Sequence, residues 1–232
     1  MLPDHIRAVV FDAVGTVLHP VKGAPKIYAD AAARYGIHDT PEAIRQRFVA
    51  AYLVEEYVDK LCDWRTDEAR EMRRWQSIVF AALPGAPQEC FEELYSHFTK
   101  PEAWFAPPEA ADVFAALQAC RLTLGLGSNY DTRLQTVLAG RPELDALSKH
   151  VVISSVVGVR KPGRGFFGTL TAELGFDSED IAFVGDDLEN DYEGAEEAGM
   201  FPVLLDPLGK HPGIKNRIKN LRDLTRLNEP KA

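Results

Sequence analysis

The chain has 232 residues, of which 46% are hydrophobic and 26% charged, and its formal net charge is −9. This length allows one large domain, or a core with a smaller inserted domain. The acidic balance argues against nucleic acid and anionic membrane surfaces as partners, because both would repel the protein.

The cysteines are few and widely spaced. Cys62, Cys90 and Cys120 form no Cys-x-x-Cys pair, which is atypical of a disulfide framework or a zinc site and fits a reducing compartment. The first residues lack the basic and long apolar regions of a signal peptide. No apolar run approaches the ~20 residues that span a membrane. We therefore expect a cytoplasmic protein without a membrane segment.

The first predicted element is a strand that ends in an aspartate. Residues 8–18 read Ala-Val-Val-Phe-Asp-Ala-Val-Gly-Thr-Val-Leu, so an apolar run stops at Asp12 and Gly15-Thr16 predicts a turn. Such a run is typical of a parallel strand buried on both faces. Open α/β sheets place their chemistry at the carboxyl ends of strands, so Asp12 is a candidate functional residue.

The stretch from residue 22 to residue 106 is different, because it has helical patterns and no convincing strand. We predict helices over residues 27–35, 41–61, 67–83 and 89–98. Thr40 followed by Pro41 predicts an N-cap and a helix start, and Pro84-Gly85 predicts a stop. We therefore expect an all-helical insertion after the first strand.

Beyond the insertion, strands and helices alternate. We predict strands over residues 122–126, 151–153, 181–184 and 202–205, and helices over residues 109–119, 166–174 and 192–198. This alternation predicts an α/β fold with a doubly wound parallel sheet. Residues 1–21 and 107–232 would form the core domain, and residues 22–106 the inserted helical domain. We expect residues 227–232 to be loosely held, as chain ends often are.

Polar motifs follow three of these later strands. They are Ser128-Asn129, Lys161-Pro162 and the acidic run Gly185-Asp186-Asp187-Leu188-Glu189-Asn190-Asp191. Pro162 restricts the lysine backbone to an extended form, and clustered carboxylates after a strand suit a hard cation such as Mg²⁺. Taken singly, each motif also fits a plain turn, a surface cation or a solvated loop.

With Asp12, these motifs stand in the order of the four motifs of the haloacid dehalogenase (HAD) superfamily of hydrolases, which the chain resembles over nearly its whole length. The Phe-Asp-Ala-x-Gly-Thr start also resembles the little-characterised REG-2-like branch. The resemblance implies a Rossmann-like core with a helical cap of the C1 type. It implies a Mg²⁺-dependent phosphohydrolase or phosphotransferase that acts on a small phosphorylated substrate.

The resemblance also implies roles for individual residues. Asp12 would be the nucleophile that forms an aspartyl-phosphate, and Lys161 the cation that offsets charge beside it. Thr16, Ser128 and Asn129 would bind the substrate or support its loop. Mg²⁺ would be held by Asp12, the backbone carbonyl of Val14, Asp186 and Asp191. Asp187 and Glu189 are weaker candidates, and we expect Arg160 to lie at the surface.

Val14 departs from the family pattern, because it stands where the resemblance places a second aspartate that serves as general acid and base. Such catalysis contributes about 10²–10⁴-fold. We therefore expect weak activity on alkyl phosphates. Acyl phosphates, anhydrides and aryl phosphates should suffer least, because their leaving groups need less protonation.

Two alternatives remain open. One is a degenerate HAD protein that binds a ligand or partner without turnover. The other is a metal-independent 2-haloacid dehalogenase, although the acidic run and the lack of an Arg after the first motif argue against it. His19 is a further candidate for the pocket wall, although a lone histidine there is more often solvated or structural. Four residues of the insertion are candidates as well, although packing in the core or exposure to solvent would also explain them: Tyr52, Trp64, Arg65 and Trp75.

Overall fold

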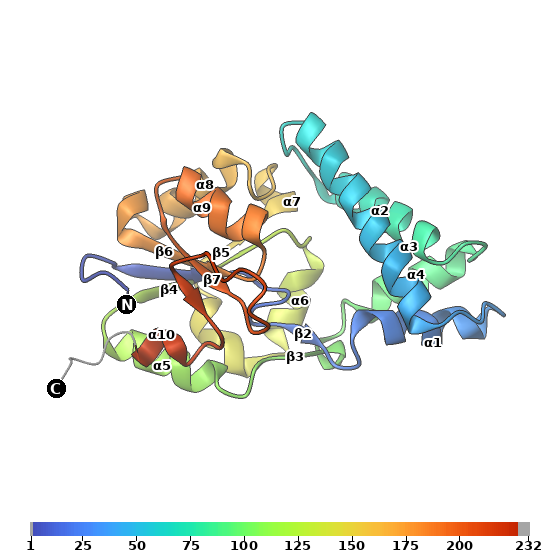
Figure 1. Ribbon diagram of the computed structural model, residues 1–232, viewed down its shortest axis with the longest axis horizontal. Helices are drawn as coiled ribbons and strands as arrows, with labels where there is room; N and C mark the ends of the chain where they lie inside the picture. Colours follow the sequence, from blue (N-terminus) through green and yellow to red (C-terminus); the bar gives the residue numbers. More distant parts are fainter. Residues whose placement is uncertain (1, 227–232) are drawn as a thin grey trace.

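The computed structural model describes residues 2–226 (Figure 1), so the expectation for residues 227–232 lies outside the described residues. Within this range the core is a parallel sheet of six strands in the order β5-β4-β1-β6-β7-β8. The strands are β1 (Ala8–Phe11), β4 (Thr123–Ser128), β5 (Val151–Ile153), β6 (Ile181–Gly185), β7 (Phe201–Leu205) and β8 (Arg217–Ile218). The predicted α/β class is confirmed. Sequence reasoning missed only β8 of this sheet, because two residues carry no readable period.

Helices cover both faces of the sheet. On one face lie α5 (Ala110–Ala119), α6 (Arg133–Ala139) and α10 (Asp223–Arg226), and on the other lie α8 (Arg164–Leu174) and α9 (Gly194–Glu197) (Figure 1). Val9 and Phe11 of β1 pack into the first layer, and Ala8 and Val10 pack into the second. A strand buried on both faces needs apolar residues at every position, which explains its continuous apolar run.

Short helical elements complete the core. They are η1 (Pro101–Ala103), η2 (Pro142–Leu147), α7 (Ser154–Val157), η3 (Ser178–Asp180) and the π-helical segment η4 (Leu188–Glu193). The helix predicted over residues 192–198 is therefore the end of η4 followed by α9. No helix in residues 2–226 is both long enough and apolar enough to cross a membrane.

Between β1 and β4 the chain forms a separate helical body that projects from one end of the sheet (Figure 1). Its helices are α1 (Ala24–Arg34), α2 (Pro41–Leu61), α3 (Glu68–Ala82) and α4 (Gln88–His97). The predicted N-cap is confirmed, since Thr40 Oγ1 accepts a hydrogen bond of 3.2 Å from the Ala43 amide. The body has its own apolar cluster, which includes Ile44, Val79 and Phe91.

The two passes of the chain between core and helical body pair with each other. β2 (His19–Pro20) and β3 (Trp104–Phe105) form an antiparallel two-stranded sheet. The prediction that residues 22–106 contain no strand is therefore wrong at β3. Two residues have no periodicity of their own, and they become a strand only because the fold brings the outgoing and returning passes together.

Candidate active site

The candidate site lies where three neighbouring strands end. β4, β1 and β6 are adjacent in the sheet, and their carboxyl ends carry Ser128, Asp12 and Asp186. The strand order reverses direction at β1, since β4 and β5 lie on one side of it and β6, β7 and β8 on the other. A reversal of this kind opens a crevice above the sheet, where α/β proteins bind their ligands.

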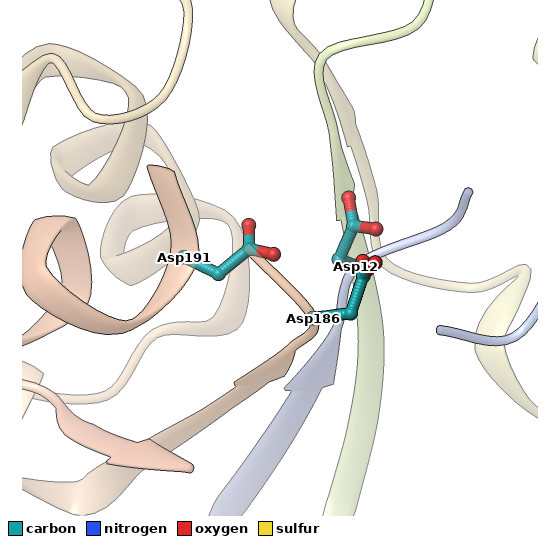
Figure 2. Close-up of side chains that lie close together, drawn as sticks. All are labelled: Asp12, Asp186 and Asp191. Carbon is teal, nitrogen blue, oxygen red and sulfur yellow. The ribbon is translucent and has the colours of Figure 1, made fainter. Parts of the chain in front are cut away.

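Three carboxylates meet in this crevice. One ligand oxygen from each of Asp12, Asp186 and Asp191 lies within 4.8 Å of the others, and Figure 2 shows Asp191 pointing toward the other two. Two glycines allow this approach. A Cβ at Gly15, whose φ is +101°, would collide with the Asp186 carboxylate, and a Cβ at Gly185 would collide with that of Asp191. The glycines of the first and fourth motifs thus make room for the acidic cluster.

Lys161 inserts its ammonium group among these carboxylates. The side chain is 2% exposed, and Nζ donates hydrogen bonds of 2.6 Å to Asp12, 2.6 Å to Asp191 and 3.1 Å to the Gly127 carbonyl. Burial alone would lower the pKa of Lys161, but the charges of Asp12 and Asp191 outweigh burial and raise it. The lysine is therefore a permanent cation beside the candidate nucleophile.

The surroundings of these three carboxyl groups raise their pKa values and so disfavour ionisation. Burial raises the pKa of Asp12 to about 6, although Lys161 opposes the rise. Desolvation and the charges of neighbouring aspartates raise the pKa of Asp186 to about 7. The pKa of Asp191 also rises to about 7, chiefly through burial. Each group would ionise more readily if a further cation were present.

This donor set fits Mg²⁺. Three ionised carboxylates exceed the single charge of Lys161, which leaves an excess of negative charge that a divalent cation would neutralise. The ligand atoms are oxygens, which hard cations prefer. Thr16 Oγ1 donates to Asp186 at 3.3 Å, and the Asp187 amide donates to Asp191 at 3.1 Å, so both carboxylates are oriented by neighbours.

The residues predicted to contact substrate take different positions. Ser128 is 2% exposed and lines the cavity, and its Oγ accepts a 3.2 Å hydrogen bond from the Tyr130 amide, so its hydroxyl proton can still be donated. Asn129 clamps Lys161, because its Oδ1 accepts from the Lys161 amide at 2.8 Å and its Nδ2 donates to the Lys161 carbonyl at 3.0 Å. Thr16 is fully buried beneath Asp186 and is not part of the cavity wall.

The remaining acidic residues of the fourth motif have local tasks. The Asp187 carboxylate caps η4 by accepting hydrogen bonds from the amides of Glu189 at 3.0 Å and Asn190 at 2.8 Å. Glu189 is exposed. Val14 is 37% exposed and lines the cavity, while the role predicted for its carbonyl stays a prediction.

A cavity of about 370 Å³ extends from the carboxylates into the helical body. Its size is typical of small-molecule pockets. Of the residues proposed from the insertion, Tyr52 and Trp75 line it, whereas Trp64 and Arg65 do not. His19 is also absent from the wall, and its ring lies 5.4 Å from that of Phe105.

Arg160 is buried, and the expectation that it lies at the surface is wrong. Its side chain is 1% exposed and enters the helical body, where it pairs with Glu71, with Glu56 at 3.3 Å and with Asp59 at 3.3 Å. The cause is a backbone pairing, since the Arg160 amide donates to the Trp64 carbonyl at 2.8 Å. The sequence did not indicate these ion pairs, because the carboxylate partners lie 89 or more residues away.

Sequence reasoning also missed Asn190, Tyr130 and Arg133 as cavity residues. Asn190 stands within the acidic motif, 7% exposed, and its Nδ2 donates to Glu56 of α2 at 3.3 Å. Its position in that motif was a usable signal. Tyr130 and Arg133 follow Ser128-Asn129 by one and four residues and were equally close to a recognised motif.

Comparison with known proteins identifies the family to which the chain belongs, and that family consists of hydrolases. The model of the haloacid dehalogenase-like hydrolase family matches residues 6–199, and the chain belongs to that family. A hydrolase of Schizosaccharomyces pombe, itself uncharacterized, is 30% identical over 199 residues, which cover 82% of this chain and 86% of the relative. The human haloacid dehalogenase-like hydrolase domain-containing protein 3 is 27% identical and is matched over 92% of this chain and 89% of its own. The phosphoglycolate phosphatase of Salmonella typhi is 26% identical over 87% of this chain and 82% of its own.

Solved structures of both catalytic types share the fold. The L-2-haloacid dehalogenase RSc1362 superposes with a TM-score of 0.75 at 20% identity, over 96% of this chain and 98% of its own. A HAD phosphatase from Thermococcus onnurineus superposes with a TM-score of 0.66 at 22% identity, over 96% and 97%. At these identities the likeness establishes the fold, and the chemistry must be argued from the site.

Proposed function

We propose that the protein is a Mg²⁺-dependent phosphohydrolase or phosphotransferase that acts on a small phosphorylated substrate through an aspartyl-phosphate. The observation that carries the proposal is the convergence of Asp12, Asp186 and Asp191 around Lys161. Metal-free displacement of halide from carbon has no use for an excess of carboxylates beside the nucleophile. That excess favours phosphoryl chemistry over dehalogenation.

The residues divide the work as follows. An oxygen of Asp12 attacks phosphorus and forms the new P–O bond, while the bond to the leaving group breaks and its electron pair departs with that group. Water then attacks the aspartyl-phosphate, which releases phosphate and restores the carboxylate. Lys161 and the Ser128 hydroxyl stabilise the phosphoryl oxygens, and Asn129 positions Lys161. Mg²⁺, when bound by Asp12, Asp186 and Asp191 with the Val14 carbonyl, would neutralise negative charge on the phosphoryl group.

We also propose that residues 22–106 act as a cap over this site. The cavity wall contains residues from the core and from the helical body, so the helical body would select substrates and exclude water. Glu68 of α3 supports this role, because its carboxylate accepts hydrogen bonds of 3.0 Å from the amide and the hydroxyl of Thr132 in the core. Assignment to the C1 type and to the REG-2-like branch rests on the sequence motifs.

The test is phosphate release from acetyl phosphate and p-nitrophenyl phosphate, with and without Mg²⁺. We expect release that requires Mg²⁺ and that Asp12→Asn abolishes, because the amide cannot form the aspartyl-phosphate. Unchanged turnover in Asp12→Asn would refute the assignment of the nucleophile. Absence of release from both compounds would favour the ligand-binding alternative, and halide release from a 2-haloacid in the presence of a chelator would favour dehalogenation.

A further inference from the structure

Part of the cavity wall is aromatic and comes from the segment between β1 and β4. Six of the ring-bearing side chains in the wall contact one another, and we call them the aromatic chamber: Tyr28, Phe48, Tyr52, Trp75, Phe98 and Trp104. They come from α1, α2, α3, the end of α4 and β3. The chamber therefore joins parts of the helical body that lie far apart in sequence.

The rings of the chamber contact one another as a continuous set. Phe48 lies at its centre, with ring centroids 5.6 Å from Tyr28, 6.3 Å from Tyr52 and 6.4 Å from Trp75. Tyr28 continues to Phe98 at 6.2 Å, and Phe98 to Trp104 at 5.5 Å. Aromatic rings packed at these distances form a rigid apolar surface that favours another flat ring. The same cavity reaches Asp12 and Asp186.

Within the described part of the chain, every arginine in the cavity wall already forms an ion pair, so none is available to bind a second anionic group of a substrate. Three arginines line the cavity in the described part of the chain, and each is paired with carboxylates. Arg74 pairs with Glu56 and with Asp59 at 2.9 Å. Arg133 pairs with Asp131 at 2.8 Å, and Arg160 pairs with Glu71. A substrate with a carboxylate or second phosphate would therefore compete with ion pairs that already exist.

Resting on the proposed function, we infer that the substrate is a phosphate monoester of an aromatic hydroxyl compound. The phosphoryl group lies at Asp12 and the ring lies in the aromatic chamber. Val14 agrees with this class. Its side chain has no proton to give, and a phenolate leaves with the P–O electron pair without first being protonated. In the second step water cleaves the aspartyl-phosphate and restores the Asp12 carboxylate; one of its protons remains on the hydrogen phosphate released, and the other balances the phenolate, which becomes the phenol in solution.

Binding to a protein that cannot turn over tests the substrate class apart from catalysis. Asp12→Asn in the presence of Mg²⁺ is titrated calorimetrically with 1-naphthyl phosphate and with methyl phosphate, which carry the same phosphate group. We expect 1-naphthyl phosphate to bind at least about tenfold more tightly, because its ring leaves water for an apolar wall. Equal affinities would overturn the inference.

Substitutions test whether the preference for 1-naphthyl phosphate arises in the aromatic chamber. Trp75→Leu in the Asp12→Asn background should reduce the preference for 1-naphthyl phosphate, whereas Tyr57→Leu should retain it, since Tyr57 of α2 is 63% exposed and lies outside the cavity wall. A preference that survives Trp75→Leu undiminished would place the ring elsewhere and overturn the inference. The comparison of two ligands on one protein remains decisive if Trp75→Leu fails to fold.

Turnover assays on the unaltered protein test the proposed function independently of the substrate class. Hydrolysis of acetyl phosphate without a preference for 1-naphthyl phosphate would keep the phosphohydrolase and discard the aromatic substrate. A preference for 1-naphthyl phosphate without any Mg²⁺-dependent turnover would discard the phosphohydrolase and keep the ligand class.

Discussion

Replacement of Arg160 tests the connection between the core and the helical body. Arg160→Met removes the guanidinium from a site that is 1% exposed and leaves Glu71, which is fully buried, without its cation. Glu56 and Asp59 lose one of their partners as well. Removal of one member of a buried charge pair costs about 3–5 kcal/mol, because the remaining charge is uncompensated. For a chain of this size that loss lowers Tm by about 6–20 °C.

The assay is thermal and urea unfolding of Arg160→Met at neutral pH, beside Arg73→Met as a matched control. Arg73 lies on α3 and is exposed, so its replacement should change the free energy of unfolding by no more than about 0.5 kcal/mol. The double variant Arg160→Met, Glu71→Leu should recover part of the loss, since it removes the uncompensated carboxylate. A loss for Arg160→Met below about 1 kcal/mol would refute the reasoning, because it would mean that the guanidinium is not needed to balance buried charge.

Three further predictions concern the candidate site. The pKa values of Asp186 and Asp191 are raised from 3.8 to about 7, so their contribution to stability is full below pH 3.8 and is lost as the pH rises through 7. Mg²⁺ competes with these protons, and thermal unfolding should show a larger rise in Tm with Mg²⁺ at about pH 8 than at about pH 5; equal rises would contradict a metal site here. Val14→Asp should raise kcat on an alkyl phosphate by up to about 10²–10⁴-fold if the missing acid is the only defect, and an unchanged kcat would refute that condition. Lys161→Met should lower kcat on acetyl phosphate by about 10²–10³-fold, because the phosphoryl oxygens lose their cation. Lys149→Met, at an exposed position, serves as the control, and equal kcat values for the two variants would argue against a catalytic lysine.

Local pattern was sufficient for most of the fold. The runs that became β1, β4, β5, β6 and β7 are almost entirely buried, and burial of this kind favours apolar residues and glycine over charged ones. The N-cap at Thr40 was readable because capping depends on residues only three apart. β3 and β8 were not readable, since two-residue strands exist only through the partner that they meet.

Some features of the candidate site could be predicted from the sequence, and others depend on the tertiary structure. Asp12 and Asp186 directly follow β1 and β6, and Ser128 ends β4; because parallel strands end at a common edge, the sequence alone determined that these three side chains would lie together. Lys161 is separated from β5 by α7, so its contacts with Asp12 and Asp191 were decided by the tertiary structure. The tertiary structure alone decided what surrounds them. The burial of Arg160 and the aromatic chamber depend on contacts between segments far apart in the chain, and no local period encodes which distant side chain will face another.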